Sequence, residues 1–325
     1  MYTEIEIKSL INKALSSIIT RNSPVELYDP ILYSISIGGK RIRPVLCLLC
    51  YNLFKETIDN SIIMPAIGIE VFHGFTLIHD DIMDNAGIRR GNTTVHKKWD
   101  KNTAILSGDA MCIEAYRLVS QTNTDYLPQI FDVFGKTAAQ VCEGQQFDIN
   151  FENRFLISED DYLMMINLKT AAMIAASAKI GAIAGEASIS DCENLYQFGY
   201  NLGMAFQIQD DVLDTYGNPS VFGKAIGGDI VSNKKTFLLV SALIRAQGRQ
   251  MCNLENLLKT ENITSDEKIE EIKKIFDELE IKQLADTRIS HYFKTAMEYL
   301  DRIDMNQYRK ENIIKFTNEL IDRNY

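Results

Sequence analysis

Helical periodicity constrains the fold of this chain more than any other feature. Apolar residues recur at intervals of three and four along most segments, and the alternation of β-strands is nearly absent. Only six prolines and no linker rich in glycine, serine or proline interrupt the 325 residues. We therefore expect an all-α fold, a single-domain helical bundle over residues 1–325 whose polar motifs face a common interior cleft. Pro65 fits the first turn of its helix and Gly87 fits the end of the same one. The predicted helices are 3–20, 25–36, 43–55, 63–85, 102–120, 126–149, 158–185, 188–216, 230–247, 263–278, 280–301 and 305–322.

Charge and composition exclude several classes of function. The formal net charge is −10 and no block of lysine and arginine is present, which argues against a nucleic-acid partner. The N-terminal residues lack the basic and apolar regions of a signal peptide, and the longest apolar stretches, such as Ala171–Ala184, fall short of a membrane span. The six cysteines form no disulfide framework, so we expect a reduced, cytoplasmic protein in which Cys47 and Cys50 are core residues.

The motif Asp-Asp-x-x-Asp ends two apolar runs, first in Phe75–Asp84 and again in Phe206–Asp214. On a helix the outer aspartates of each motif project from one face, while the middle one lies about 100° round the axis, as a weaker or supporting ligand. Carboxylates packed this densely repel one another unless a cation lies between them. Their hard oxygen atoms suit Mg²⁺, which shares its shell with substrate phosphates. A single acidic helix face is often only solvated, but two copies indicate a metal site. The aspartates of the two motifs are Asp80, Asp81, Asp84, Asp210, Asp211 and Asp214.

Basic residues accompany the first acidic motif. The segment Gly38–Pro44 places Lys40 and Arg43 after two glycines, at the start of a predicted helix. Glycines allow a ligand to approach the backbone closely, and both a helix N-terminus and basic side chains favour an anion. The alternative for this segment is a basic turn in solvent. His73 lies two turns before the acidic motif on the same helix, where it could donate to a phosphate or be a satisfied core histidine.

Further basic residues follow each acidic motif. Arg89 and Arg90 lie between glycines and could serve two separate anions. Lys169 lies in a largely apolar helical segment, where a lysine seldom occurs without an anionic partner. Lys224 and Lys234 come after the second motif. An acidic protein that places its cations beside its aspartate motifs is predicted to bind a metal ion together with a polyphosphate.

Together these residues resemble the trans-isoprenyl diphosphate synthases, also called polyprenyl synthetases, over nearly the whole chain. The resemblance implies an all-helical fold of the isoprenoid synthase type around a deep central cavity, usually in a homodimer. It also implies condensation of isopentenyl diphosphate with allylic diphosphates. The motifs that carry it are Gly38-Gly-Lys-Arg-Ile-Arg-Pro44, Asp80-Asp-Ile-Met-Asp84, Arg89-Arg90-Gly91, Ser107-Gly-Asp109, Gly144-Gln145-x-x-Asp148, Lys169-Thr170, Phe206–Asp214 and the two later lysines.

The resemblance assigns roles residue by residue. Isopentenyl diphosphate would be bound by Lys40, Arg43, His73 and Arg90. The allylic diphosphate would be bound by Arg89, Lys169, Lys224 and Lys234. Asp80 and Asp84 would hold two Mg²⁺ ions and Asp210 a third, while Thr170 and Gln207 would present oxygen atoms to the developing cation. The C-terminal tail is less basic than in relatives that close the site with it, so no role is assigned to Arg323.

Product length is expected to depend on the residues before the first motif. In the family, aromatic residues at both four and five positions before the first aspartate favour farnesyl diphosphate (C15). Here Phe75 lies five positions before Asp80, but the position four before it is Thr76. With Phe72 one turn further away, this resembles the type that makes geranylgeranyl diphosphate (C20), with the C15 product as the second expectation. The alternative is that Phe72 and Phe75 merely pack between helices.

Two other functions remain open on sequence grounds. A class I terpene cyclase is also all-helical and binds Mg²⁺ through an aspartate-rich motif, but it takes one diphosphate and has no use for the segment Gly38–Pro44. A non-catalytic subunit of a heteromeric prenyl synthase would be expected to have lost aspartates or basic ligands, and none is missing here.

Overall fold

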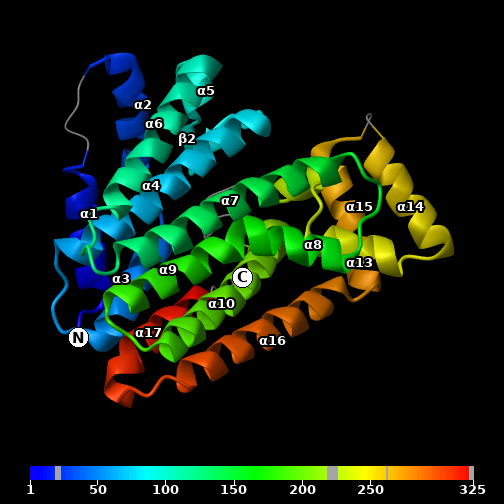
Figure 1. Ribbon diagram of the computed structural model, residues 1–325. Coiled ribbons are helices and arrows are strands. Elements are labelled where there is room, and N and C mark those ends of the chain that lie inside the picture. The colour runs from blue at the N-terminus through cyan, green and yellow to red at the C-terminus, as the bar shows by residue number, and fades with distance from the viewer. Residues whose placement is uncertain (19–22, 218–225, 261–262, 322–325) are drawn as a thin grey trace. The chain divides into compact units, whose positions relative to one another are not determined.

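The computed structural model describes residues 1–18, 23–217, 226–260 and 263–321, and within them helices predominate (Figure 1). The all-α prediction is confirmed. The helices are α1 (Glu4–Leu15), α2 (Val25–Ser36), α3 (Ile42–Phe54), α4 (Asn60–Met83), α5 (Val95–Lys98), α6 (Lys101–Val119), α7 (Leu127–Glu152), α8 (Glu159–Ile166), α9 (Ala172–Ala184), α10 (Ile189–Tyr216), α12 (Gly228–Val231), α13 (Phe237–Arg245), α14 (Gly248–Lys259), α15 (Ser265–Glu278), α16 (Ile281–Asp301) and α17 (Gln307–Ile321). A π-helical turn, η1 (Asn167–Ala171), joins α8 to α9, and the short strands β1 (Ile88–Arg89) and β2 (Asn92–Thr93) pair antiparallel.

The bounds of α4 differ from the predicted 63–85 at both ends. The helix begins at Asn60 because the carboxylate of Asp59 caps it, accepting the N–H of Ser61 at 2.9 Å. Pro65 therefore lies inside the helix and not in its first turn. The helix ends at Met83 with Asp84 as its C-cap, so Gly87 lies beyond the helix. Both predictions for these two residues were wrong.

Two other predicted helices are interrupted. The segment predicted as 158–185 contains η1 in its middle. The segment predicted as 230–247 forms the short helix α12 and the separate helix α13, because the Thr236 hydroxyl caps α13 by accepting the N–H of Leu239. The next helix, α14, was not predicted, since Gly248 and two asparagines lower its helix propensity.

The described chain divides into two compact units, and neither is a continuous stretch of sequence. Unit 1 comprises residues 1–136, 174–196 and 302–316, and unit 2 comprises residues 137–173, 197–301 and 317–325. The expectation of one domain over residues 1–325 stays a prediction, as does the deep central cavity. Each unit carries one of the two acidic motifs.

Unit 1 is built on the close packing of α4 along α6, which Figure 1 shows side by side. Glycines on both helices allow this approach. A Cβ atom added to Gly68 would lie 2.8 Å from the carbonyl oxygen of Ala115, and one added to Gly108 would lie 2.4 Å from Nε2 of His79. The packing holds the C-terminal end of α4, which carries the first acidic motif, in a defined position.

Unit 2 has an apolar core to which α8, α10, α13, α15 and α16 all contribute. Its largest fully buried side chains include Tyr162, Phe237 and Phe276. The ring of Tyr162 meets that of Phe237 edge-on at 5.9 Å between centroids. This core holds the C-terminal half of α10, which carries the second acidic motif.

Two helical segments, Asn60–Met83 and Glu159–Ala184, are long and apolar enough to cross a membrane by length and composition. The expectation that no stretch reaches this length was therefore wrong. Most of each segment is buried inside the protein, as is usual for core helices, so these segments are weak evidence for a membrane span.

Candidate active site

The first acidic motif lies at the carboxyl end of α4. Asp80 and Asp81 are in its last turn, and Asp84 is the C-cap, whose N–H donates to the carbonyl oxygen of Asp80 at 2.8 Å. Asp81 is buried, Asp80 is half-buried and Asp84 is exposed. The partial negative charge of the helix C-terminus adds to the repulsion among these carboxylates. The arrangement therefore favours a bound cation.

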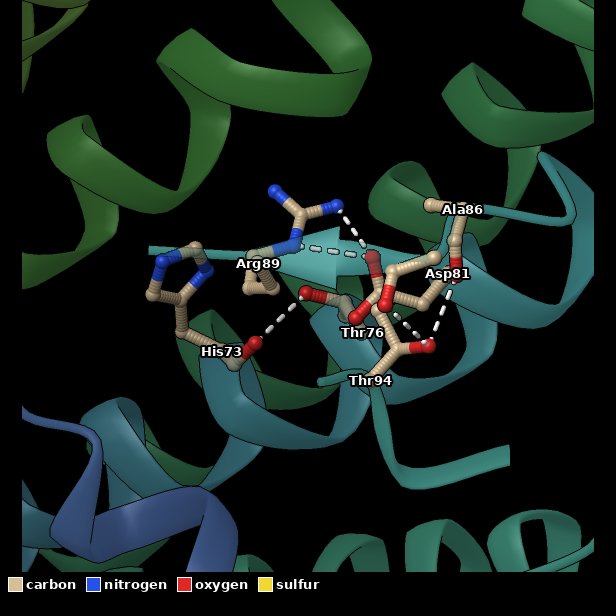
Figure 2. A network of polar contacts seen from close by, with 7 residues as sticks. His73, Thr76, Asp81, Ala86, Arg89 and Thr94 are labelled. Atoms are coloured by element: carbon tan, nitrogen blue, oxygen red, sulfur yellow. Dashed lines mark hydrogen bonds and ion pairs between the residues drawn. The ribbon is translucent and has the colours of Figure 1, made fainter. Parts of the chain in front are cut away.

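The buried member of this motif, Asp81, is held by Arg89 of β1 (Figure 2). Nε and Nη2 of Arg89 both donate to Oδ1 of Asp81, at 2.8 and 2.6 Å. The turn that leads to β1 is fixed by Thr94, whose hydroxyl donates to the carbonyl oxygen of Ala86 at 2.7 Å. Burial raises the pKa of Asp81, and the contact with Arg89 offsets part of this effect. Arg89 keeps further N–H groups with which to bind an anion.

The glycine-rich loop before α3 meets the hairpin through Arg90. Nη1 of Arg90 donates to the carbonyl oxygen of Gly38. Gly39 allows this approach because a Cβ atom there would lie 2.5 Å from the same nitrogen. Arg41 in this loop points to α4, where it pairs with Glu70 at 2.7 Å, and it also donates to the carbonyl oxygen of Ile35 at 3.0 Å. The loop before α3 and the hairpin, joined by a contact across 52 positions of sequence, thus form one cationic region.

His73 lies within this cationic region. Burial and the nearby guanidinium groups of Arg43, Arg90, Arg89 and Arg41 lower its pKa well below the usual range. The imidazole is therefore neutral near pH 7 and can donate one N–H without adding to the charge. Arg41 pairs with Glu70, and Arg89 pairs with Asp81. Four guanidinium groups gathered around a neutral imidazole are suited to bind an anion.

The second acidic motif lies in the last two turns of α10, in unit 2. Asp211 is buried and accepts hydrogen bonds from the hydroxyl of Tyr162 at 2.6 Å, the N–H of Phe237 at 2.8 Å and Nε2 of Gln207 at 3.0 Å. Burial raises the pKa of Asp211 to about 7, and the charge of Asp229 acts in the same direction while the three donors oppose it. Asp210 is half-buried.

Asp214, the last aspartate of this motif, contacts the first turn of α12. Its carboxylate accepts the N–H of Asp229 at 3.0 Å. Lys234 comes just after the turn that follows α12, and its backbone N–H donates to the carbonyl oxygen of Asp229 at 2.9 Å. The predicted ligand Lys224 lies outside the described residues, as does Arg323.

Lys169 and Thr170 lie in the π-helical turn η1. Nζ of Lys169 pairs with Oδ2 of Asp148 on α7 at 2.6 Å, and the hydroxyl of Thr170 donates to Oε1 of Gln207 on α10 at 2.9 Å. Gly144 on α7 allows the close contact, because a Cβ atom there would lie 2.4 Å from the backbone nitrogen of Lys169. The turn thus directs two neighbouring side chains to partners on different helices.

The comparison with known proteins decides the family. A family model described as polyprenyl synthetase matches residues 24–279. The chain belongs to this family. A geranylgeranyl diphosphate synthase of Methanosarcina mazei is 38% identical over 236 residues, 72% of this chain and 72% of the relative. A geranylfarnesyl diphosphate synthase of Natronomonas pharaonis is 33% identical over 98% of this chain and 96% of the relative. The crystal structure of a geranylgeranyl pyrophosphate synthase superimposes with a TM-score of 0.94, at 39% identity and over 100% of both chains.

Membership of this family gives the chemistry in outline. The chain is an enzyme, a short-chain trans-prenyltransferase of isoprenoid biosynthesis. The matched family is that of the polyprenyl synthetases, so the alternative function of a terpene cyclase is excluded. A polyprenyl synthase of Caulobacter crescentus, 24% identical to this chain, has been crystallised in complex with calcium, a divalent metal ion, and isoprenyl diphosphate.

The donor atoms of this polyprenyl synthetase fit such a metal ion. Among the residues that the structure describes, no three or more of His, Cys, Asp and Glu are grouped so that they could hold a metal by themselves. Asp80 and Asp84 instead offer carboxylate oxygens one helical turn apart and leave coordination positions for phosphate oxygens and water. Mg²⁺ is bound in this way in many phosphate-transfer sites.

The aromatic residues before the first motif form a continuous cluster in unit 1. Phe72 is buried and meets Phe75 and Phe134 edge-on, with centroids 5.3 and 5.4 Å apart. Phe75 is half-buried and meets His79 at 4.7 Å. The hydroxyl of Thr76 donates to the carbonyl oxygen of His73 at 2.9 Å, so its polar atom is satisfied within the helix (Figure 2). Phe72 supports Phe75 from the core side, which agrees with the alternative of packing between helices.

Several residues of the site were not predicted. Arg41 and Glu70 belong to segments that the sequence marked, and a lone carboxylate in an apolar helix could have indicated a buried partner. Asp148 was part of a recognised motif but had no assigned role. Tyr162 and the backbone of Phe237 gave no signal, because only the fold brings them to Asp211.

Proposed function

We propose that this enzyme condenses isopentenyl diphosphate with allylic diphosphates and makes geranylgeranyl diphosphate as its main product. The observation that carries the proposal is the arginine group around His73 beside the Asp-Asp-x-x-Asp motif of α4. The arginine group would bind one diphosphate, and the aspartates of the neighbouring motif would bind metal ions, as a reaction between two diphosphates requires. Relatives named geranylgeranyl diphosphate synthases support the C20 product.

The basic residues divide between the two substrates in this proposal. Lys40, Arg43, His73 and Arg90 bind isopentenyl diphosphate, and Arg90 is held by the carbonyl oxygen of Gly38. Arg89, Lys169, Lys224 and Lys234 bind the allylic diphosphate. Arg41 is not among the ligands, because Glu70 already occupies its guanidinium group.

Charge stabilisation dominates the proposed mechanism. Asp80 and Asp84 would hold two Mg²⁺ ions and Asp210 a third, and bound Mg²⁺ would neutralise the departing pyrophosphate. Thr170 and Gln207 present oxygen atoms to the allylic cation, and apolar side chains exclude the water that would quench it. The proton lost after the new C–C bond forms passes to pyrophosphate, so no protein base is needed. We further propose a cytoplasmic homodimer with no membrane span.

The purified chain alone tests the proposal. With Mg²⁺, isopentenyl diphosphate and an allylic primer, it should form C20 diphosphate that mass spectrometry detects. No product from the purified chain would instead identify it as the subunit of a heteromeric synthase. A main product of C15 would contradict the assignment of product length, and one of C25 would place it with the geranylfarnesyl relatives.

Phe75 is expected to limit the length of the product. Phe75→Ala should lengthen it by at least one isoprene unit, because the half-buried ring is removed from the helix that bears the metal ligands. Adding Phe72→Ala should lengthen it further, since Phe72 supports the same position. Phe155→Ala, which changes an exposed phenylalanine in unit 2, is the control and should leave the product unchanged. An unchanged product in both test variants would mean that other residues set the length.

A further inference from the structure

A chain of hydrogen bonds runs through unit 2 from a fully buried tyrosine to the π-helical turn. Tyr162 is 1% exposed, and its hydroxyl donates to Oδ2 of Asp211 at 2.6 Å. The N–H of Phe237 donates to the same oxygen at 2.8 Å. The other oxygen, Oδ1, accepts Nε2 of Gln207 at 3.0 Å. The carboxylate is therefore held on both oxygens by groups from three different helices.

This fixed carboxylate orients Gln207 and, through it, Thr170. A glutamine amide has one acceptor oxygen and one NH₂ group, and the two ends differ little in shape. Because the NH₂ group of Gln207 faces Asp211, its Oε1 is the atom that accepts the hydroxyl of Thr170, at 2.9 Å. The only proton of the Thr170 hydroxyl is used in this bond. Oγ1 of Thr170 and Oε1 of Gln207 therefore both keep oxygen lone pairs to offer to a ligand, while Asp211 uses one of the two N–H groups of Gln207.

We propose that Tyr162 is a positioning residue for the condensation, acting through Asp211 to ensure that Gln207 and Thr170 present their oxygen atoms to the allylic cation. This inference rests on the proposed function, which places these two residues beside the cation. Without the Tyr162 hydroxyl, Oδ2 of Asp211 keeps the N–H of Phe237 alone, and the carboxylate can rotate. Gln207 can then flip and turn its NH₂ group towards positive charge. Fixed dipoles stabilise a developing charge only when they need no reorientation.

The pKa of the Tyr162 hydroxyl supports this role. Burial and the neighbouring Asp211 raise it well above the usual range, so the hydroxyl remains a donor throughout the working pH range. Tyr162 lies in the apolar core of unit 2, with its ring against Phe237, and so acts through Asp211 and not on substrate.

The test compares two tyrosines that each donate to an aspartate in unit 2. Tyr162→Phe should lower kcat about tenfold, the order expected for loss of a hydrogen bond to a charged group. Both KM values should stay within about twofold, because ground-state binding of the diphosphates is unchanged. The control is Tyr216→Phe, which removes a bond of 2.7 Å to Asp277 outside this chain of contacts and should leave kcat unchanged. An unchanged kcat in Tyr162→Phe, or an equal loss in both variants, would overturn the proposal.

A double variant shows whether Tyr162 acts through Gln207. Gln207→Met should itself lower kcat, and Tyr162→Phe added to it should lower kcat no further. Losses that multiply would mean that Tyr162 acts in another way, and the proposal would be wrong. If Gln207→Met has normal kcat, the proposed role of Gln207 fails, and the inference fails with it. If Gln207→Met is slow but Tyr162→Phe is normal, the inference alone fails.

Asp211→Asn provides a second variant in case Tyr162→Phe does not fold. It interrupts the same chain of contacts at the next residue and should lower kcat while the concentration of Mg²⁺ needed for half-maximal rate stays unchanged. A raised requirement for Mg²⁺ would show that Asp211 acts on the metal, and would overturn the positioning role.

Discussion

The aspartates of each Asp-Asp-x-x-Asp motif differ in what surrounds their side chains. Asp81 and Asp211, the middle members, are buried and accept hydrogen bonds from protein donors. Asp80 and Asp210 are half-buried and Asp84 is exposed. At the carboxyl end of a helix, where the dipole is also negative, carboxylates gathered this closely are unfavourable unless a cation binds. The middle aspartates thus stabilise the structure around the outer ones.

Substitutions at neighbouring positions should separate these two roles. Asp80→Ala should lower turnover at least a hundredfold, yet leave the melting temperature in metal-free buffer unchanged or higher, because a repelling charge is removed. Asp81→Ala should lower the free energy of unfolding by about 2 kcal/mol, because Arg89 loses a charged hydrogen-bond partner. Steady-state assays and thermal melts followed by circular dichroism measure both effects. Near-normal activity of Asp80→Ala at saturating Mg²⁺ would refute the metal assignment.

The pKa of His73 leads to a prediction about pH. Because it is lowered well below the usual range, His73 contributes stability that is present above its unfolded pKa, roughly 6.5, and is lost as the pH falls through that value towards the folded pKa. Between pH 7.5 and 5.5, His73→Gln should lose about 1 kcal/mol less stability than the natural protein. Denaturant unfolding at both pH values measures this difference.

Histidine chemical shifts provide the direct measurement. The chain has four histidines, so labelled imidazole signals can be assigned by substitution. His73 should remain neutral at pH 6, and inorganic pyrophosphate should raise its pKa, because the anion offsets the surrounding arginines. Titration near 6.5 with no response to pyrophosphate would contradict the anion site around His73.

The sequence predicted those residues of the site that belong to a motif within one short stretch of chain. Aspartate motifs and arginine pairs are visible in the sequence because charged residues are unexpected beside apolar runs. Their buried partners are not visible in this way. Arg41 meets Glu70 across 29 positions, and Tyr162 meets Asp211 across 49. Such pairings exist only once the helices have packed.

At the scale of elements, regular helices were predicted well and their interruptions were not. The helix predicted as 25–36 is Val25–Ser36 in the structure, because hydrophobic spacing follows the helical period along its whole length. The π-helical turn η1 has no such signal. It lies where Gly144 of α7 and Gly203 of α10 approach its backbone, so its cause is on other helices. π-Helical turns often occur at functional sites, and this one carries Lys169 and Thr170.

Two glycines on α7 allow the role of this turn to be tested. In Gly144→Ala the added Cβ atom would lie 2.4 Å from the backbone nitrogen of Lys169, so the turn must move. We expect a loss of about 1–3 kcal/mol in stability and a raised KM for the allylic diphosphate, with the KM for isopentenyl diphosphate unchanged. Gly135→Ala is the matched control, because a Cβ atom there meets nothing within 4 Å and should stabilise the helix slightly. Equal kinetic effects in the two variants would show that the contact at Gly144 does not position Lys169.

At the scale of the whole molecule, unit 1 depends on parts of the chain that are distant in sequence. Gly181 packs against the carbonyl group of Cys47, with no room for a Cβ atom. Arg309 donates to the carbonyl oxygen of Leu53 at 3.0 Å, and Asn312 donates to that of Tyr2 at 2.9 Å. The segments 174–196 and 302–316 therefore complete the core and the polar contacts of the N-terminal 136 residues.

We expect that residues 1–136 expressed alone will not fold, although they include the whole first acidic motif and the arginine group around His73. Without the later segments, the apolar surface of α3 loses its cover, and the carbonyl oxygens of Leu53 and Tyr2 lose donors. Circular dichroism should show no cooperative thermal transition for this fragment. In the full chain, Arg309→Ala should cost about 1–2 kcal/mol and leave both KM values unchanged, because the contacts to Leu53 and Glu56 are removed. A cooperative transition in the fragment would show that the first acidic motif belongs to an independently stable unit, and that the return of the chain to unit 1 is not needed to build it.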